Sequence, residues 1–371
     1  MAETGRDNQV EIDPMILGID HLEFFVADAR LTAHFYAATL GLRPLRYTGP
    51  EVAVRDQVSI VMGAGAIHLV LTTGLEAEHP SKRFVDRHGD GVRDVAFRVR
   101  DVEESYQRAI AAGARSVREP SVVQRGSSRT IEACVSAMGD VVHSLVERPD
   151  GAPIAAPEET HLAPEPDASP LPLKGIDHIA ICGSEETLRA TVASYADAFG
   201  LVPLYDQNLR TETSAMNSRV VGTADGAVKL VLIEPVQKKV PDHLREFLHY
   251  NSGPGVQHVA LCTTDIVHCI RALRRAGVRF LRAPDGYHDG LEARVPGVLG
   301  QLPTLRELDI MVDRDAFGLL YQIFTRPIHA RPTFFLELIQ RDGAVGFGSD
   351  NVKALFQAAD REIARRRPEA G

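Results

Sequence analysis

The chain has 371 residues, of which 44% are hydrophobic and 25% are charged, and its formal net charge is −9 at pH 7. This composition is typical of a soluble globular protein, and the length exceeds what one hydrophobic core usually supports, so we expect two domains. The acidic balance argues against a nucleic-acid partner, which needs a clustered basic surface. No apolar run approaches the roughly 20 residues that span a bilayer, so we expect no membrane partner.

The segment 1–13 is polar and acidic, without the apolar core of a secretion signal, so we expect it to be disordered and the protein to be cytoplasmic. Proline recurs through residues 149–173, which is typical of an extended linker. We therefore expect an N-terminal structural domain over 14–148 and a C-terminal catalytic domain over 174–371.

The two halves open with the same four residues, which is the first sign of an internal repeat. Gly-Ile-Asp-His occurs at 18–21 and again at 175–178, each time followed by residues that favour a β-strand. A helical stretch follows in each half and ends in a similar phrase, Leu-Gly-Leu-Arg-Pro-Leu in the first half and Phe-Gly-Leu-Val-Pro-Leu in the second.

Further similar segments keep the same order in both halves. The matched pairs are 65–71 with 226–232, 89–97 with 253–261, the Asp-led helices 101–113 with 265–277, and the Arg-Pro pairs 148–149 with 326–327. Correspondences in one order indicate a duplication.

Three predicted strands of the second half each carry one ligand-capable side chain among apolar residues: His178, His258 and Glu337. A single histidine in such a strand is more often a hydrogen-bonded core residue. A glutamate is harder to explain that way, because burying an unpaired carboxylate is costly and a metal ion would supply the missing charge. Two imidazoles and one carboxylate form the iron site of non-haem Fe(II) oxygenases.

Strand alternation also predicts which residues lie on the same face as each ligand. The expected neighbours are Ile176 and Ala180 for His178, Val256 and Ala260 for His258, and Phe335 and Ile339 for Glu337.

The repeat separates the two halves by function. His21 matches His178, but Asp94 occupies the place of His258, so the first half lacks the second imidazole. We therefore expect the first half to be structural and the second half to be catalytic.

A last helix is expected to begin at Ser349 or Asp350, either of which can cap it. Its apolar residues Val352, Leu355 and Phe356 fall at helical spacing. The helix either packs on the domain or closes over the iron cavity as a lid, and both can hold.

Two βαβββ modules in tandem, one carrying His, His and Glu, resemble the vicinal oxygen chelate superfamily. The segments 251–258, 322–325, 331–341 and 346–348 resemble more narrowly the 4-hydroxyphenylpyruvate dioxygenase family. The resemblance implies an α+β fold of tandem βαβββ modules, with an open barrel in each half and a C-terminal lid helix.

The same resemblance implies that His178, His258 and Glu337 bind Fe(II), the one cofactor expected. It also implies a substrate cavity lined by Ser218, Val231, Ile233, His243, Gln257, Gln322, Phe324, Phe335, Asn351, Val352 and Phe356. The expected partners are an arylpyruvate, which carries its own 2-oxo acid, and O2. A homodimer is one of the oligomeric states that the sequence leaves open.

Enzymes of this family either hydroxylate the ring of 4-hydroxyphenylpyruvate, giving homogentisate, or hydroxylate the benzylic carbon, giving 4-hydroxymandelate. Ile233 stands where ring hydroxylases usually have Asn, and Val352 where they usually have Phe, so the chain resembles the mandelate-forming branch. Val231 and Phe356 depart from that branch, where Thr and Tyr are expected, and His243 replaces a Gln of the dioxygenase. The ring substituent accepted is therefore left open.

Three alternatives remain beside the mandelate-forming reaction. The first is the ring-hydroxylating dioxygenase of tyrosine catabolism. The second is extradiol cleavage of a catechol, which the segment 334–341 disfavours. The third is a non-catalytic binding protein of the same fold, in which the three ligand residues would hold no metal.

Overall fold

The computed structural model describes residues 15–125, 128–149, 154, 171–210, 215–236 and 242–366. The expected disordered segment 1–13 and most of the expected linker 149–173 lie outside these residues, and the domain boundaries stay a prediction. Among the helices described, none combines the length and the apolar character needed to cross a membrane.

The first half runs from β1 to β8. Its elements are β1 (Ile16–Phe25), α1 (Ala29–Leu40), β2 (Arg43–Thr48), a 3₁₀ turn (Pro50–Val52), β3 (Gln57–Ala64), β4 (Ile67–Gly74), α2 (Pro80–His88), β5 (Gly91–Val99), α3 (Val102–Ala111), β6 (Ser116–Arg125), β7 (Ser128–Ser136) and β8 (Val142–Glu147).

The second half repeats this succession and adds helices. Its elements are β9 (Leu173–Cys182), α4 (Leu188–Phe199), β10 (Val202–Arg210), β11 (Ala215–Gly222), β12 (Lys229–Pro235), α5 (His243–Tyr250), β13 (Gly255–Thr263), α6 (Ile266–Arg275), α7 (Leu291–Arg294), a 3₁₀ turn (Leu299–Gln301), α8 (Leu302–Leu308), β14 (Met311–Arg314), β15 (Leu319–Phe324), β16 (Phe335–Asp342) and α9 (Ser349–Arg366).

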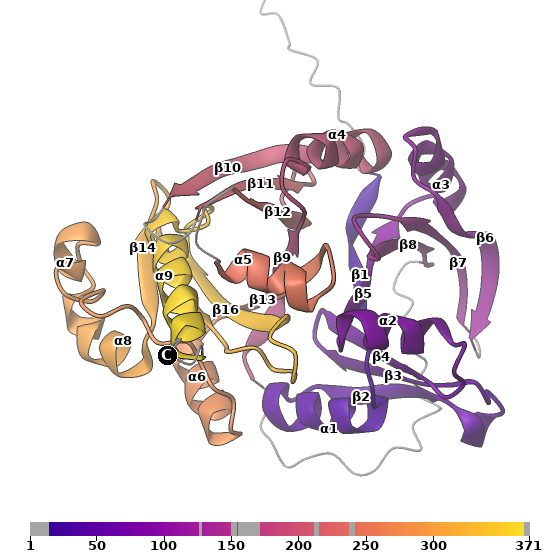
Figure 1. The fold of residues 1–371 in the computed structure, drawn as a ribbon, viewed down its shortest axis with the longest axis horizontal. Coiled ribbons are helices and arrows are strands. Elements are labelled where there is room, and N and C mark those ends of the chain that lie inside the picture. The colour runs from indigo at the N-terminus through magenta and orange to yellow at the C-terminus, as the bar shows by residue number, and fades with distance from the viewer. Residues whose placement is uncertain are drawn as a thin grey trace, which may run out of the picture.

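Each half forms one curled sheet, and the strand order is the same in both. The described strands pair as β2-β3-β4-β1-β5-β8-β7-β6 and as β10-β11-β12-β9-β13-β16-β15-β14 (Figure 1). In the first half, β1-α1-β2-β3-β4 and β5-α3-β6-β7-β8 are two βαβββ modules, joined by antiparallel pairing of β1 with β5. The internal duplication and the expected fold of tandem βαβββ modules are confirmed, but each half contains two such modules instead of one.

Local sequence explains the helix ends. Asp101 and Asp265 accept hydrogen bonds from backbone N–H groups three residues further on, and α3 and α6 begin directly after them. Gly41 and Gly200 close α1 and α4 at φ values of 68° and 65°, where a residue with a Cβ would be strained. The Asp-led helices expected from the repeat are confirmed.

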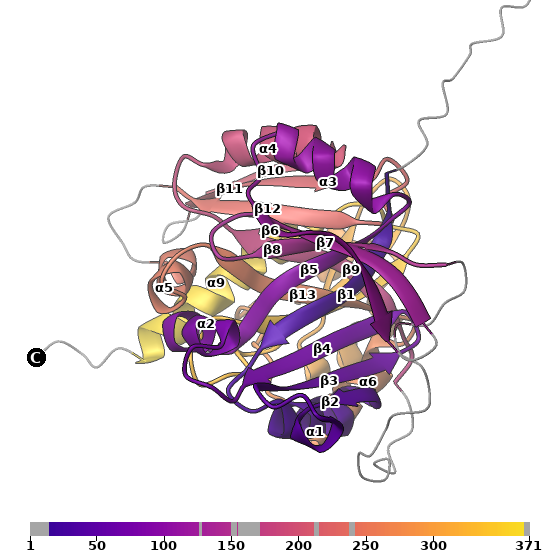
Figure 2. The ribbon, with the colours of Figure 1, turned by 90° about the vertical axis from the view of Figure 1, so that its right-hand side faces the viewer.

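The two halves pack against each other through their central strands and neighbouring helices. β5 contacts β13, and α3 contacts α4 (Figure 2). Phe24 of β1 meets Phe334, which lies directly before β16, edge-on at 5.2 Å between ring centroids. Buried apolar residues from both sheets form one continuous cluster, so the first half supports the strands that carry the candidate site.

Two β-bulges alter the strand faces expected from alternation. On β9, His178 lies opposite Ala260 of β13 while Ile176 lies opposite Leu261, so one residue, Asp177, is extra. Paired residues share a face, so Ile176 lies on the opposite face from His178.

A second bulge affects His258 in the same way. His258 lies opposite Ala180 and Val256 lies opposite Ile181, so Gln257 is the extra residue. The expected neighbours Ile176 and Val256 are therefore wrong, because a bulge shifts the alternation by one residue. The expected neighbours Ala180, Ala260, Phe335 and Ile339 are confirmed.

The expected C-terminal helix is α9. It packs against β14 and α5, beside the concave side of the second sheet (Figure 1). Asn351 in its first turn is fully buried, and Ser349 at its start hydrogen-bonds through its hydroxyl to Tyr205 of β10 at 3.0 Å.

Candidate metal centre

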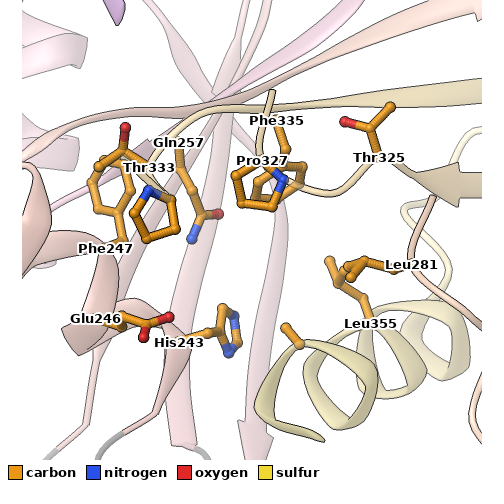
Figure 3. A pocket seen from close by; sticks show the side chains of 12 residues that line it. His243, Glu246, Phe247, Gln257, Leu281, Thr325, Pro327, Thr333, Phe335 and Leu355 are labelled. Atoms are coloured by element: carbon orange, nitrogen blue, oxygen red, sulfur yellow. The ribbon is translucent and has the colours of Figure 1, made fainter. Parts of the chain in front are cut away.

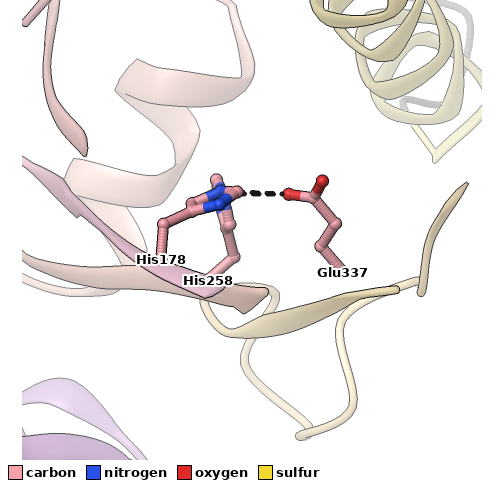
Figure 4. A group of neighbouring side chains, drawn as sticks. All are labelled: His178, His258 and Glu337. Atoms are coloured by element: carbon pink, nitrogen blue, oxygen red, sulfur yellow. Dashed lines mark ion pairs between the residues drawn. The ribbon is translucent and has the colours of Figure 1, made fainter. Parts of the chain in front are cut away.

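Three neighbouring strands bring the two imidazoles and the carboxylate together. Ala260 of β13 pairs with His178 of β9 on one side and with Glu337 of β16 on the other. Oε2 of Glu337 lies 3.2 Å from Nε2 of His178 and 3.6 Å from Nε2 of His258 (Figure 4). All three side chains are buried, and their ligand atoms lie within 4.8 Å of one another, a group found nowhere else in the described chain.

The bulge residues orient the two imidazoles. Nδ1 of His178 lies 3.0 Å from Oδ1 of Asp177, and Nδ1 of His258 lies 3.2 Å from Oε1 of Gln257. Because both oxygens can only accept, each Nδ1 carries a proton and each Nε2 faces Glu337, from which position it would bind a metal ion.

Asp177 is held in turn by Arg341. Nε and Nη2 of Arg341 donate to the two carboxylate oxygens of Asp177 at 2.7 and 2.9 Å. Burial raises the pKa of Asp177, but His178 and Arg341 outweigh it and hold the pKa well below its usual range. Sequence reasoning overlooked Asp177 and Arg341, although the repeated Asp-His pair was a visible signal.

The first half contains the same arrangement at its own Asp-His pair. Arg148 donates to both carboxylate oxygens of Asp20, at 2.6 and 2.9 Å, and Asp20 binds Nδ1 of His21. Arg148 is therefore the counterpart of Arg341. The match of 148–149 with 326–327 is wrong, because those residues follow β8 and β15, which hold different places in their sheets.

A buried chain of hydrogen bonds positions the carboxylate. Nε2 of Gln322 donates to Oε1 of Glu337 at 2.8 Å, and Oε1 of Gln322 accepts from Nδ2 of Asn351 at 2.8 Å. Oδ1 of Asn351 accepts from the hydroxyl of Tyr287 at 2.6 Å. The expected site residues Gln322 and Asn351 therefore connect Glu337 to α9, and Tyr287 was not foreseen because it comes from an irregular segment.

The protonation state of the metal-free centre follows from its burial and charge. Burial lowers the pKa of His178, but Glu337 and Asp177 outweigh it and raise that pKa to about 9. Burial and the charge on His178 lower the pKa of His258 well below its usual value. Without a metal ion, His178 is the cation that compensates Glu337. A divalent cation would replace that proton, so the donor set fits such an ion.

Aromatic rings enclose the two imidazoles. Phe335 stacks on His258 with ring centroids 4.8 Å apart, and Phe324 meets the same imidazole edge-on at 6.3 Å. Phe347 meets His178 at 5.2 Å and was not foreseen. The expected aromatic walls Phe324 and Phe335 are thus next to the centre.

A pocket adjoins the centre on the side of His258. Gln257 and Phe335 line it together with His243 and Glu246 of α5 and Leu355 of α9 (Figure 3). Phe356 is buried, and its ring packs edge-on against His243 at 4.2 Å, while Nδ1 of His243 lies 3.1 Å from Asp360. The expected residues His243 and Phe356 are thus placed where α5 meets α9.

The remaining expected residues lie on β11, β12 and α9. Val231 pairs with Ala180 and Ile233 with Cys182, and Ser218 pairs with Ile233, so all three share the sheet face of His178. The hydroxyl of Ser218 donates to the backbone of Gln207 at 3.1 Å. Val352 is half-buried on α9 and packs against the main apolar cluster. Their role as substrate contacts stays a prediction.

Comparisons with known proteins agree with the fold. Models of the glyoxalase/bleomycin resistance protein/dioxygenase superfamily match residues 18–155 and 177–294. The 4-hydroxyphenylpyruvate dioxygenase of Yarrowia lipolytica is 33% identical, with 94% of this chain and 93% of that protein covered. That of Danio rerio is 35% identical over 93% of this chain and 90% of its own length. This chain belongs to the 4-hydroxyphenylpyruvate dioxygenase family.

The resemblance to that family is therefore confirmed. Among solved structures, a mutant of 4-hydroxymandelate synthase from Streptomyces coelicolor is 37% identical, covers 95% of this chain and 100% of its own, and superposes with a TM-score of 0.85. The described chain carries two curled sheets, and the clustered side chains of His178, His258 and Glu337 could hold a metal ion.

Proposed function

We propose that this protein is an Fe(II)-dependent oxygenase that converts 4-hydroxyphenylpyruvate, or a close arylpyruvate, and O2 into 4-hydroxymandelate and CO2. His178, His258 and Glu337 would hold the metal, which when bound supplies a site that chelates the 2-oxo acid and activates O2. One oxygen atom enters the benzylic carbon and the other enters the carboxylate left by decarboxylation, so no further reductant is required.

The observation that carries the proposal is the buried group of two oriented imidazoles and one carboxylate. Each imidazole has its Nδ1 engaged and its Nε2 directed at Glu337, while Gln322 engages the other carboxylate oxygen. The surrounding rings of Phe324, Phe335 and Phe347 exclude water from a reactive centre.

Benzylic rather than ring hydroxylation is proposed from two side chains. Ile233 lies on the same sheet face as His178, on the neighbouring strand, where a ring hydroxylase would present an amide. Val352 lies on α9, one residue from the buried Asn351, where a ring hydroxylase would present a phenyl ring. An apolar wall and a smaller side chain change where the aryl ring rests, and its position selects the carbon that is hydroxylated.

The second candidate is ring hydroxylation to homogentisate. It is favoured by the relatives named 4-hydroxyphenylpyruvate dioxygenase, which are 33% and 35% identical over nearly the whole chain. The two candidates share the substrate and the proposed metal, so product identity separates them.

The deciding experiment is anaerobic reconstitution with Fe(II), followed by 4-hydroxyphenylpyruvate and one equivalent of O2. Chromatography against standards is needed because the two products are isomers. We expect 4-hydroxymandelate, and homogentisate as the sole product would contradict the proposal. Failure to bind Fe(II) would instead support a non-catalytic binding protein.

A double substitution tests the residues behind the selectivity. Ile233→Asn with Val352→Phe is expected to move product toward homogentisate, because it restores the amide and the phenyl ring of the ring hydroxylases. Leu232→Met is the control, since Leu232 lies on the opposite face of β12 and is fully buried there. An unchanged product ratio in the double variant would show that these two positions do not select the carbon.

A further inference from the structure

The concave side of the first sheet contains a cavity of about 420 Å³ that the proposed reaction does not use. It is the counterpart of the metal centre, because His21 pairs with Ala96 as His178 pairs with Ala260. In the first half, the shorter Ser144 lies at the position that corresponds to Glu337 of the second half. Glu23 lies at the position that corresponds to Ala180. This face therefore has a histidine at the position that corresponds to His178, and polar side chains line much of its cavity.

Carboxylates form the floor of this cavity. Glu23 of β1 and Asp94 of β5 are directly paired on the two central strands, so their side chains lie on the same face. Thr72 donates to Glu23 at 2.6 Å, and the backbone N–H of Ser144 donates to Asp94 at 2.8 Å. Burial and the nearby charge of Asp94 raise the pKa of Glu23, while the bond from Thr72 and the charges of His21 and Arg118 oppose the rise. A further positive charge beside the two carboxylates would relieve their remaining repulsion.

Guanidinium groups stand at the rims. Arg46 lies on β2 and Arg118 on β6, which are the two edge strands of the sheet, and both side chains line the cavity. Arg118 also contacts Glu132 at 3.3 Å, and Arg46 donates to the backbone of Ile154 at 3.5 Å. A guanidinium has five donors, so the contact with Glu132 leaves donors of Arg118 for an anionic group.

We propose that this cavity binds a small zwitterion of the α-amino acid class. Its ammonium would lie at the floor beside Glu23 and Asp94, and its carboxylate, which is bonded to the same carbon, would face Arg118. Hydroxyl and amide groups of Ser59, Thr48 and Gln57 also line the cavity, which suits a polar side chain. The site is independent of the metal centre and of the reaction proposed there.

The test uses full-length, metal-free protein, so that neither turnover nor iron affects the result. The twenty common L-amino acids are screened by saturation-transfer NMR, and the tightest is titrated by calorimetry beside the amine that lacks its carboxylate and the acid that lacks its ammonium. We expect one site per chain, with each single-charge analogue about tenfold weaker or more, since one charge-assisted interaction is then lost.

Variants locate the site. Glu23→Gln and Arg118→Gln should each weaken binding about tenfold or more. The matched controls Glu78→Gln and Arg83→Gln remove an exposed ion pair on the outside of the same half and should change nothing. His258→Ala should also retain binding, because it removes a ligand residue of the other half.

Several results would overturn the inference. They are no amino acid binding up to about 10 mM, an amine or acid binding as tightly as its amino acid, unchanged binding in both cavity variants, or loss of binding in His258→Ala. If Glu23→Gln does not fold, Asp94→Asn with the same readout replaces it.

Discussion

At the scale of single residues, the metal-free centre contains an ion pair between His178 and Glu337. His178 is protonated with a pKa of about 9, and Glu337 is its counter-ion. A metal ion must displace that proton, so metal affinity and pH are linked.

We therefore expect the apparent affinity for Fe(II), or for Co(II) as a stable substitute, to rise about tenfold per pH unit from pH 6.5 to 8.5 and to level off near 9. Calorimetry in buffers of different ionisation enthalpy should show about one proton released per metal ion at pH 7. Affinity that is flat over this range would contradict a protonated His178.

The raised pKa of His178 also predicts the direction in which the stability of the metal-free protein changes with pH. A raised pKa stabilises the folded metal-free protein fully below the unfolded-state value of about 6.5, and that contribution is lost as pH rises through about 9. Urea denaturation of metal-free protein should show stability falling across this window. Metal-loaded protein, in which the proton is gone, is the control and should not show this loss.

The duplication offers a matched test of Asp177. Asp177→Asn removes the charge that orients His178 and binds Arg341, so we expect metal affinity to fall about 10- to 100-fold. Asp20→Asn makes the same change in the first half, against His21 and Arg148, and should leave metal affinity unchanged. Equal effects of the two substitutions on metal affinity, measured by calorimetry, would show that only global stability is at work.

At the scale of elements, Gly348 before α9 lies close to Gln322, which hydrogen-bonds to the carboxylate of Glu337. Gly348 has a φ of 70°, and a Cβ there would lie 2.5 Å from Oε1 of Gln322. The amide of Gln322 donates to Glu337 and accepts from Asn351, so it connects α9 to the proposed metal ligand.

We expect Gly348→Ala to lower the free energy of unfolding by about 1–2 kcal/mol, since the residue needs a positive φ, and to weaken metal binding because Gln322 is displaced. Chemical denaturation and metal titration would measure the two effects. Gly300→Ala is the control, because a Cβ at Gly300 meets nothing within 4 Å and its φ is ordinary. Unchanged metal affinity in Gly348→Ala would show that the start of α9 does not influence the metal centre.

At the scale of the whole molecule, the first half holds the loop that leads into β13. His88 of α2 is buried and lies between the backbone carbonyl of Asn251 and the carboxylate of Asp140, at 2.8 Å from the latter. The amide of Asn251 donates to the carbonyls of Gly253 and Pro254, which directly precede the strand carrying His258. The first half thus positions His258, a proposed metal ligand of the second half.

His88→Ala should therefore cost about 1–3 kcal/mol of stability, because a buried carbonyl loses its partner, and should reduce metal affinity as well. The exposed His34→Ala on α1 is the control for removing a histidine from the same half. Denaturant unfolding and metal titration are the measurements. A stability loss with unchanged metal affinity would mean that the two halves pack together without positioning His258.

The sequence by itself was enough for the features that depend on repetition and pattern. The duplication, the Asp-capped helices, the last helix and the three ligand-bearing strands were all visible, because capping, strand alternation and matched segments act over a few residues. His178, His258 and Glu337 stood out because each polar residue interrupts an apolar strand.

Only the tertiary structure decided how these side chains are oriented and supported. Bulges at Asp177 and Gln257 reverse the expected face of Ile176 and Val256, since a register shift depends on the partner strand rather than on local sequence. Arg341 reaches Asp177 across 164 positions of the chain, and a bond of that kind has no local pattern. The ligand types could be foreseen from the residues, whereas the hydrogen bonds that aim them come from strands brought together by folding.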